Sequence, residues 1–174
     1  MTGTTLMKIC VIDAFPNLPY SAEREFIRRL EIVGQRLGIE IIPVVTSSSI
    51  ETHCPDFVLA THEFSAKLTS FPTYGALWSP PKYFEGDIIR MRNIFSYDGY
   101  VVGSDCVRSF LNESLSAYPY LTKPISDFRM LPTCPSQPQL DAVSQDRSLI
   151  YSGVHWDGDR HRELFLALHK SKQI

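Results

Sequence analysis

The sequence lacks any long hydrophobic run and any strong excess of one charge. No apolar stretch approaches the roughly 18–20 residues that a membrane-spanning helix needs. The start, MTGTTLMKICVID, holds only a short apolar run broken by Lys8, which is unlike a signal peptide. The formal net charge is −2 at pH 7, so bulk electrostatics favour neither nucleic acid nor an anionic membrane. We therefore expect a cytoplasmic protein without a nucleic-acid partner; peripheral membrane contact stays open.

Cysteine is also scarce, and the four cysteines form no C-x-x-C pair: Cys10, Cys54, Cys106 and Cys134. A chain of 174 residues that is 44% hydrophobic can bury a core without disulfides, so we expect these thiols to be reduced. His155 and His161 are not at the spacing of helical metal ligands, and no cysteine pair joins them. The sequence therefore predicts neither a metal site nor a bound cofactor.

What the chain does contain is a repeated alternation of short apolar runs and amphipathic stretches. The run KICVIDAF at 8–15 is almost continuously apolar, as in a strand covered on both faces. Ser21 is suited to cap the next helix, and Gly38 is suited to end it. Further strands are predicted at 39–47, 55–62, 73–79, 97–104 and 125–133, and further helices at 86–95 and 105–115.

This alternation predicts an α/β fold: a Rossmann-like, open, mostly parallel sheet with helices on both faces. Pro43 lies inside the predicted second strand. Proline has no N–H to donate to a neighbouring strand, so we expect this strand to lie near an edge or to carry an irregularity.

The composition changes after residue 131. The stretch 132–147 is rich in proline, glutamine and serine and poor in large apolar residues, which is typical of a linker. A short apolar run at 149–151 and an amphipathic stretch follow it. A parallel strand in that place needs neighbours on its edges and faces. We therefore expect a Rossmann-like unit at 1–131 and, at 148–174, the opening strand, loop and helix of a truncated second unit.

Ligands of open α/β sheets bind beyond the carboxyl ends of the strands, where loops lead into helices. The loop after the first strand, DAFPNLPYSAERE, has no G-x-G-x-x-G fingerprint, so it predicts either ligand contacts or an ordinary capped turn. In LWSPPKYFEGD, Trp78 belongs either to a platform for a flat ligand such as a sugar ring or to the core. The residues expected to line a cleft are Asn17, Tyr20, Ser21, Glu63, Trp78, Lys82 and Tyr83.

His62 follows the third predicted strand directly, in the stretch ATHEF. Imidazole has a reference pKa of about 6.5, so a neutral histidine in this place could take the proton of an acceptor hydroxyl as a general base. The alternative is a hydrogen-bonded loop histidine that finishes a strand. We take His62 as the catalytic candidate.

The last loop, SGVHWDGDRHREL, is dense in side chains that can bind. Gly153 allows a close backbone approach, and Arg160 lies near a helix start, where free N–H groups and the helix dipole attract phosphate. His155 and Trp156 are large side chains of the same loop. The alternative is a solvated polar turn in which an aspartate caps the helix.

Taken in order, these segments resemble a glycosyltransferase of the GT-B class, in which two Rossmann-like domains face each other across a cleft. PDFVLATHEF is similar to the strand and histidine of the acceptor-side domain, and YDGYVVGSDCVRSFL to its late strand, which ends here in Ser104. MLPTCP resembles the exit from that domain. SLIYSGVHWDGDRHRELFLAL resembles the first strand, glycine loop and helix of the nucleotide-sugar-binding domain.

The resemblance implies transfer of a sugar from a nucleotide-diphosphate donor to a hydroxyl of a glycan, lipid-linked or small-molecule acceptor, without a bound metal. The donor contacts that it implies are Gly153, His155, Trp156 and Arg160. His62 would act on the acceptor, and Ser104 would line the cleft. Two alternatives stay open: a single-domain, flavodoxin-like binding or regulatory module, and a scaffold that kept the fold and lost the chemistry.

Overall fold

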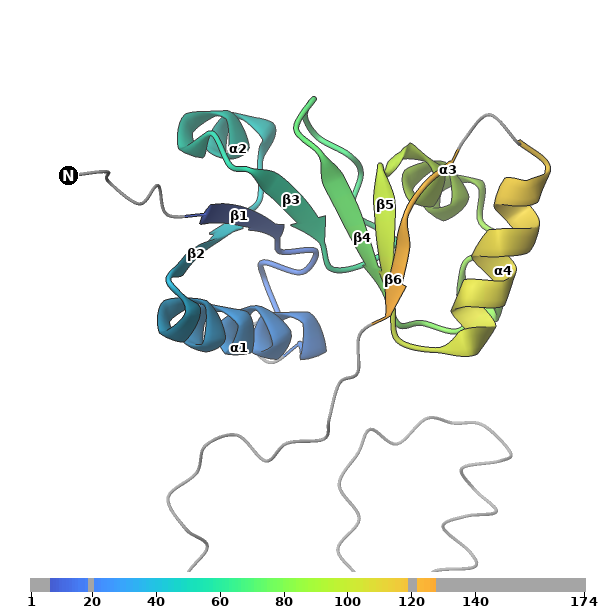
Figure 1. The fold of residues 1–174 in the computed structure, drawn as a ribbon, viewed down its shortest axis with the longest axis horizontal. Helices are drawn as coiled ribbons and strands as arrows, with labels where there is room; N and C mark the ends of the chain where they lie inside the picture. Colours follow the sequence, from blue (N-terminus) through green and yellow to red (C-terminus); the bar gives the residue numbers. More distant parts are fainter. Residues whose placement is uncertain (1–6, 19–20, 119–121, 128–174) are drawn as a thin grey trace, which may run out of the picture. The chain divides into compact units, whose positions relative to one another are not determined.

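Six parallel strands lie side by side in the part of the chain that the structure describes, in the order β2-β1-β3-β4-β5-β6 (Figure 1). The structure is a computed structural model, and it describes residues 7–18, 21–118 and 122–127. The strands are β1 (Met7–Ile12), β2 (Ile39–Val44), β3 (Phe57–Ala60), β4 (Thr73–Leu77), β5 (Gly99–Val102) and β6 (Ile125–Asp127). The helices are α1 (Ala22–Leu37), α2 (Ser47–His53), α3 (Ile88–Ser96) and α4 (Asp105–Ser116), with a 3-10 turn η1 (Pro81–Tyr83).

Helices cover both faces of this sheet, as the sequence predicts. The strand residues Cys10 and Tyr100 share one buried core with Ile50 of α2, and side chains of α3 and α4 complete that core. Helix α1 packs on the opposite face, where a Cβ on Gly34 would come within 2.6 Å of the Ile41 side chain. Figure 1 shows α1 and α2 on opposite sides of β1. The predicted α/β class with an open parallel sheet is confirmed.

Strand β2 forms one edge of the described sheet and pairs with β1. Pro43 stands opposite Val11 in this pairing and is exposed. An edge strand tolerates proline because one of its sides has no neighbour that needs an N–H. The prediction that Pro43 marks an edge is confirmed.

The predicted strand at 39–47 was too long, and helix α2 was missed. Strand β2 ends at Val44, and Thr46 accepts a hydrogen bond from the Ser49 N–H at 3.3 Å, as an N-cap does. The helix has seven residues, and Ile50 is its buried one. A helix of seven residues with a single buried apolar side chain is too short to show a helical period in the sequence.

The described residues belong to a unit that spans Met1–Thr133. The predicted linker at 132–147 and the predicted second segment at 148–174 lie outside the described residues. In the described ranges, no helix combines the length and the apolar character that crossing a bilayer requires.

Candidate functional site

The strand order reverses between β1 and β3, which makes this point the switch point of the sheet. The chain leaves β1 for β2 on one side and returns for β3 on the other side, so the loops that follow β1 and β3 lead away in opposite directions. The hydroxyl of Thr61, just after β3, donates to the Ile12 carbonyl oxygen at 2.9 Å. The rings of Phe15 and His62 meet edge to face with centroids 5.0 Å apart. The two loops therefore meet at His62.

His62 is held by two aromatic rings and by one ring nitrogen. Its side chain is 12% exposed and stacks on Phe64 with centroids 4.9 Å apart. The Phe64 backbone N–H donates to His62 Nδ1 at 3.1 Å. The Glu63 Oε2 atom lies 3.6 Å from the same nitrogen. A neutral His62 in this arrangement carries its proton on Nε2, because Nδ1 is accepting a hydrogen bond.

Burial lowers the pKa of His62 below its usual value. The carboxylates of Glu63 and Glu23 raise the pKa and oppose this effect, and the positive charge of Arg90 lowers it further. Because the desolvation of the ring is the largest cause, His62 is neutral at pH 7. A neutral imidazole is the form that a general base requires, and its protonated nitrogen can still donate a hydrogen bond.

Arg90 of α3 joins the His62 loop to the turn η1. Its guanidinium lies 4.0 Å from the centroid of the Phe64 ring, and Nη1 lies 3.7 Å from Glu63 Oε1. The same nitrogen donates a hydrogen bond to the Tyr83 carbonyl oxygen. Glu63 itself is 2% exposed, so this guanidinium is the charge that offsets a buried carboxylate. Sequence reasoning missed Arg90, because nothing in IIRMRN separates it from the exposed Arg92.

Two buried polar side chains, those of Asn93 and Tyr97, hold the backbone of residues 63–65 in place by hydrogen bonds. The Asn93 amide donates to the carbonyl oxygens of Glu63 and Phe64, both at 3.1 Å. The Tyr97 hydroxyl donates to the carbonyl oxygen of Ser65. Both residues were missed as well; the only signal in the sequence is a polar side chain beside apolar ones in the helix around Asn93. The loop that carries His62 is therefore attached to α3 and to the chain after it.

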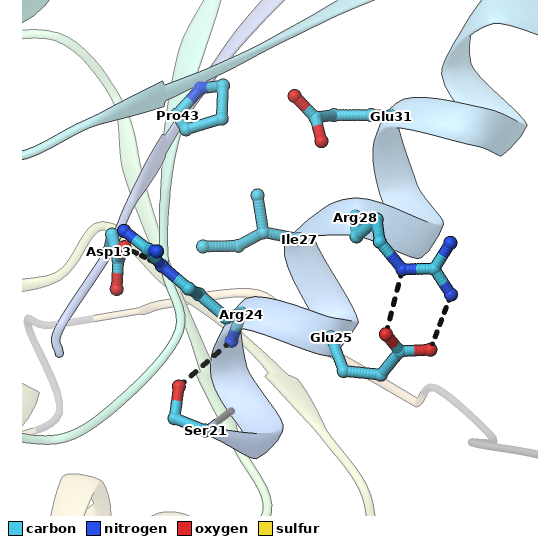
Figure 2. Close-up of a pocket in the computed structure, with 8 residues that line it drawn as sticks. All are labelled: Asp13, Ser21, Arg24, Glu25, Ile27, Arg28, Glu31 and Pro43. Atoms are coloured by element: carbon cyan, nitrogen blue, oxygen red, sulfur yellow. Dashed lines mark hydrogen bonds and ion pairs between the residues drawn. The ribbon is translucent and has the colours of Figure 1, made fainter. Parts of the chain in front are cut away.

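A separate hollow of about 480 Å³ lies between α1 and the carboxyl ends of β1 and β2 (Figure 2). Ser21, a predicted cleft residue, lines it and caps α1 by accepting from the Arg24 N–H at 3.1 Å. The Arg24 Nε atom donates to Asp13 Oδ2 at 3.0 Å, and Arg28 pairs with Glu25. Because these lining charges already pair with one another and His62 is not among the lining residues, we place the candidate site at His62.

The other predicted residues have separate positions. Trp78 meets the Phe26 ring edge to face at 4.9 Å and thereby packs the end of β4 against α1. Asn17, Lys82, Tyr83 and Ser104 are exposed. Ser104 caps α4, and the ammonium of Lys82 lies 5.1 Å from the Tyr83 ring centroid. Of the predicted set, the structure thus gathers His62 and Glu63, and Arg90 connects them to Tyr83. Tyr20, Gly153, His155, Trp156 and Arg160 lie outside the described residues.

No protein-family model, curated protein or solved structure matches the chain. Among the described residues, no three histidine, cysteine or acidic side chains gather closely enough to hold a metal ion.

Proposed function

We propose that the chain is the acceptor-side part of a glycosyltransferase, with His62 acting on the acceptor hydroxyl. One observation carries this proposal: a neutral, largely buried histidine stands at the switch point of a parallel sheet, with a buried carboxylate 3.6 Å from its Nδ1 atom. In sheets of this type, the switch point is where ligands bind. The order of segments that resembles the GT-B class adds support from the sequence.

The reaction needs a base. The acceptor hydroxyl loses its proton to His62, and its oxygen attacks the anomeric carbon of the donor. The bond from that carbon to the diphosphate oxygen breaks, and the nucleoside diphosphate leaves. Stabilisation of the leaving diphosphate would come from the segment that contains Gly153 and Arg160, through backbone N–H groups and positive charge.

The geometry of His62 sets one condition on this role. In the observed hydrogen-bond pattern, Nδ1 accepts from Phe64 and Nε2 carries the proton. To accept a proton at Nε2, the ring must carry its own proton on Nδ1 instead. Glu63 Oε2, at 3.6 Å, is the group placed to receive that N–H and to stabilise the imidazolium that forms. We propose that Glu63 exchanges with the Phe64 N–H when the acceptor binds.

A second candidate is a flavodoxin-like binding or regulatory module without catalysis. The strand order favours it: β2-β1-β3-β4-β5 is the order found in flavodoxin-like folds, with β6 added at the far edge. This candidate uses the same crevice but requires no proton transfer. The two proposals therefore place the ligand at the same site, but only the transferase predicts turnover.

The experiment compares variants of the protein at its natural full length. Release of nucleoside diphosphate is followed with UDP-glucose, UDP-N-acetylglucosamine and GDP-mannose, each with methyl α-glucopyranoside as acceptor. His62→Gln keeps a polar side chain of similar size but removes the base, so we expect turnover to fall by at least about tenfold. His53→Gln on α2 makes the same change elsewhere and should leave turnover unchanged. Equal turnover in the His62 variant would remove the proposed role; binding without any turnover would favour the module.

A further inference from the structure

Arg90 contacts both of the groups that compete for the Nδ1 atom of His62. One is the backbone N–H of Phe64, which donates to Nδ1 at 3.1 Å; the guanidinium of Arg90 lies 4.0 Å from the centroid of the Phe64 ring. The other is the carboxylate of Glu63, whose Oε2 atom lies 3.6 Å from Nδ1 and whose Oε1 atom lies 3.7 Å from Arg90 Nη1. The carboxylate thus lies between His62 and Arg90, with one oxygen toward each.

In the observed hydrogen-bond pattern, Nδ1 of His62 and Oε2 of Glu63 are two acceptors that face each other. Neither atom carries a proton, so their approach is unfavourable at a buried position, where charges are weakly screened. A proton on Nδ1 would turn the same approach into a charge-assisted hydrogen bond. The positive charge of Arg90 beside the other oxygen is therefore what offsets the carboxylate while Nδ1 stays unprotonated.

Contacts outside the His62 loop fix the position of Arg90. Its Nη1 atom donates to the Tyr83 carbonyl oxygen, and its Nε atom lies 3.3 Å from Asp87 Oδ2. Asp87 is the N-cap of α3 and is itself held by the backbone N–H groups of Ile89 and Arg90. The guanidinium is thus attached to η1 and to the start of α3, so it does not depend on Glu63 for its place.

We propose that Arg90 is a positioning residue for His62: it holds one oxygen of Glu63 and thereby leaves Nδ1 to the Phe64 N–H and the ring proton on Nε2. This inference rests on the proposed function, in which Glu63 takes the Nδ1–H when the acceptor binds, and it names the residue that opposes this exchange. Arg90 acts through Glu63 and keeps the free protein in the tautomer that cannot yet accept a proton at Nε2.

Loss of this guanidinium acts on the His62 ring in one direction. The carboxylates of Glu63 and of Glu23 on α1 raise the pKa of His62, and the charge of Arg90 on α3 lowers it. The loop after β1 packs the uncharged ring of Phe15 against His62. Without Arg90, we therefore expect the pKa of His62 to rise and the proton of the neutral ring to move from Nε2 to Nδ1.

The test reads the tautomer of His62 from long-range ¹H–¹⁵N spectra of the full-length protein labelled with ¹⁵N-histidine, with His62→Gln to assign the signals. Arg90→Gln removes the charge and makes a hydrogen bond to the Glu63 carboxylate available to Nδ1–H. We therefore expect the ratio of the Nδ1–H to the Nε2–H form to rise at least about tenfold. The pKa of His62 should rise in the same variant. Arg92→Gln removes a charge from an exposed position of the same helix and should change neither value.

Two further variants separate positioning from a merely structural role. In a Glu63→Gln background, Arg90→Gln should leave the tautomer ratio as Glu63→Gln alone sets it, because no carboxylate remains to take the Nδ1–H. Arg90→Lys keeps the charge but not the planar fork, so its tautomer ratio and its His62 pKa should lie between those of the wild type and Arg90→Gln. If Arg90→Gln does not fold, Arg90→Lys carries the test, and a ratio equal to that of the wild type would overturn the inference.

The remaining outcomes separate this inference from the proposed function. An unchanged ratio in Arg90→Gln, an equal change in Arg92→Gln, or an equal change in the Glu63→Gln background would each overturn the role of Arg90. The transfer proposal would stand, because it depends on turnover with nucleotide sugars. Conversely, a tautomer shift in Arg90→Gln together with unchanged turnover in His62→Gln would remove the transfer proposal and keep the role of Arg90.

The pH dependence of turnover links the two proposals. If both hold, the acidic limb of the pH profile of kcat/KM should move to higher pH in Arg90→Gln, because it follows the pKa of the base in the free enzyme. Arg92→Gln should leave the limb in place. A limb that stays in place in Arg90→Gln, while the pKa of His62 rises, would show that His62 is not the base.

Discussion

The ring of Tyr97 lies directly against the backbone of Gly75. A Cβ atom built on Gly75 would come within 2.4 Å of Tyr97 Cδ2, so only glycine leaves room for the ring over β4. The other end of the same tyrosine donates its hydroxyl to the Ser65 carbonyl oxygen, and burial raises the pKa of that hydroxyl. A glycine in the middle of the sheet therefore determines where the loop after His62 is attached.

Gly75→Ala should destabilise the protein by about 1–3 kcal/mol, because the added methyl group forces the Tyr97 ring out of its place. The measurement is urea unfolding followed by fluorescence and circular dichroism. Gly86→Ala is the matched control, since a Cβ there meets nothing within 4 Å. We expect the control to be neutral or slightly stabilising. Equal stability of the two variants would show that the ring has space to move.

Much of the fold was predictable because its signals are local. Continuous apolar runs predicted buried parallel strands, and Pro43 predicted an edge. The β2 boundary and α2 were not predictable, because the β-branched run Val44–Thr46 continues past the last strand pairing and the cap at Thr46 decides where the strand ends. Periodicity does not detect a seven-residue helix with one buried side chain.

The candidate site was predictable only in part. The rule that ligands bind beyond the carboxyl ends of strands pointed to His62, and the structure brings the loop after β1 against it. Arg90 and Asn93 were missed, because each belongs to a helix surface in sequence and gains its role from contacts across the fold. Contacts that single polar residues make across the fold produce no periodic pattern in the sequence, so they cannot be predicted from it.

The pKa of His62 should lie below the usual value of about 6.5 when measured by ¹⁵N chemical shifts of its ring. The unfolded chain then binds more protons than the native protein just below that pH. The contribution of His62 to the free energy of unfolding is therefore fully present above about pH 6.5. It is lost progressively as the pH falls from there toward the pKa of His62 in the native protein. His62→Gln should remove this part of the pH dependence. The same spectra report the tautomer, and we expect the proton on Nε2 in the free protein.

Glu63→Gln tests the direction in which the neighbouring carboxylate shifts the pKa of His62. The carboxylate of Glu63 raises the pKa of His62, so its removal should lower the pKa further. Glu31→Gln serves as the charge-matched control on α1. An upward movement of the His62 pKa in the Glu63 variant would contradict the arrangement in which this carboxylate faces the ring.

The backbone conformation of Cys54 leads to a specific prediction about stability. It ends α2 with φ 46° and ψ 62°, the left-handed conformation that costs a residue with a side chain about 1–2 kcal/mol. Gly38 ends α1 in the same region, with φ 68°. Because glycine adopts this conformation without the steric cost but loses more freedom on folding, Cys54→Gly should stabilise the protein by about 0.5–1 kcal/mol in urea unfolding.

Cys54→Ala separates the backbone effect from loss of the thiol, whose Sγ lies 3.2 Å from the Glu51 carbonyl oxygen. This variant keeps the strained conformation, so it should be no more stable than the wild type. Gly38→Ala makes the opposite change at the end of α1 and should cost about 1 kcal/mol. If Cys54→Ala and Cys54→Gly gained equal stability, the thiol rather than the left-handed backbone would be the source of the effect. A gain confined to the glycine variant, with a loss at Gly38, follows only from the helix-ending conformation that the two positions share.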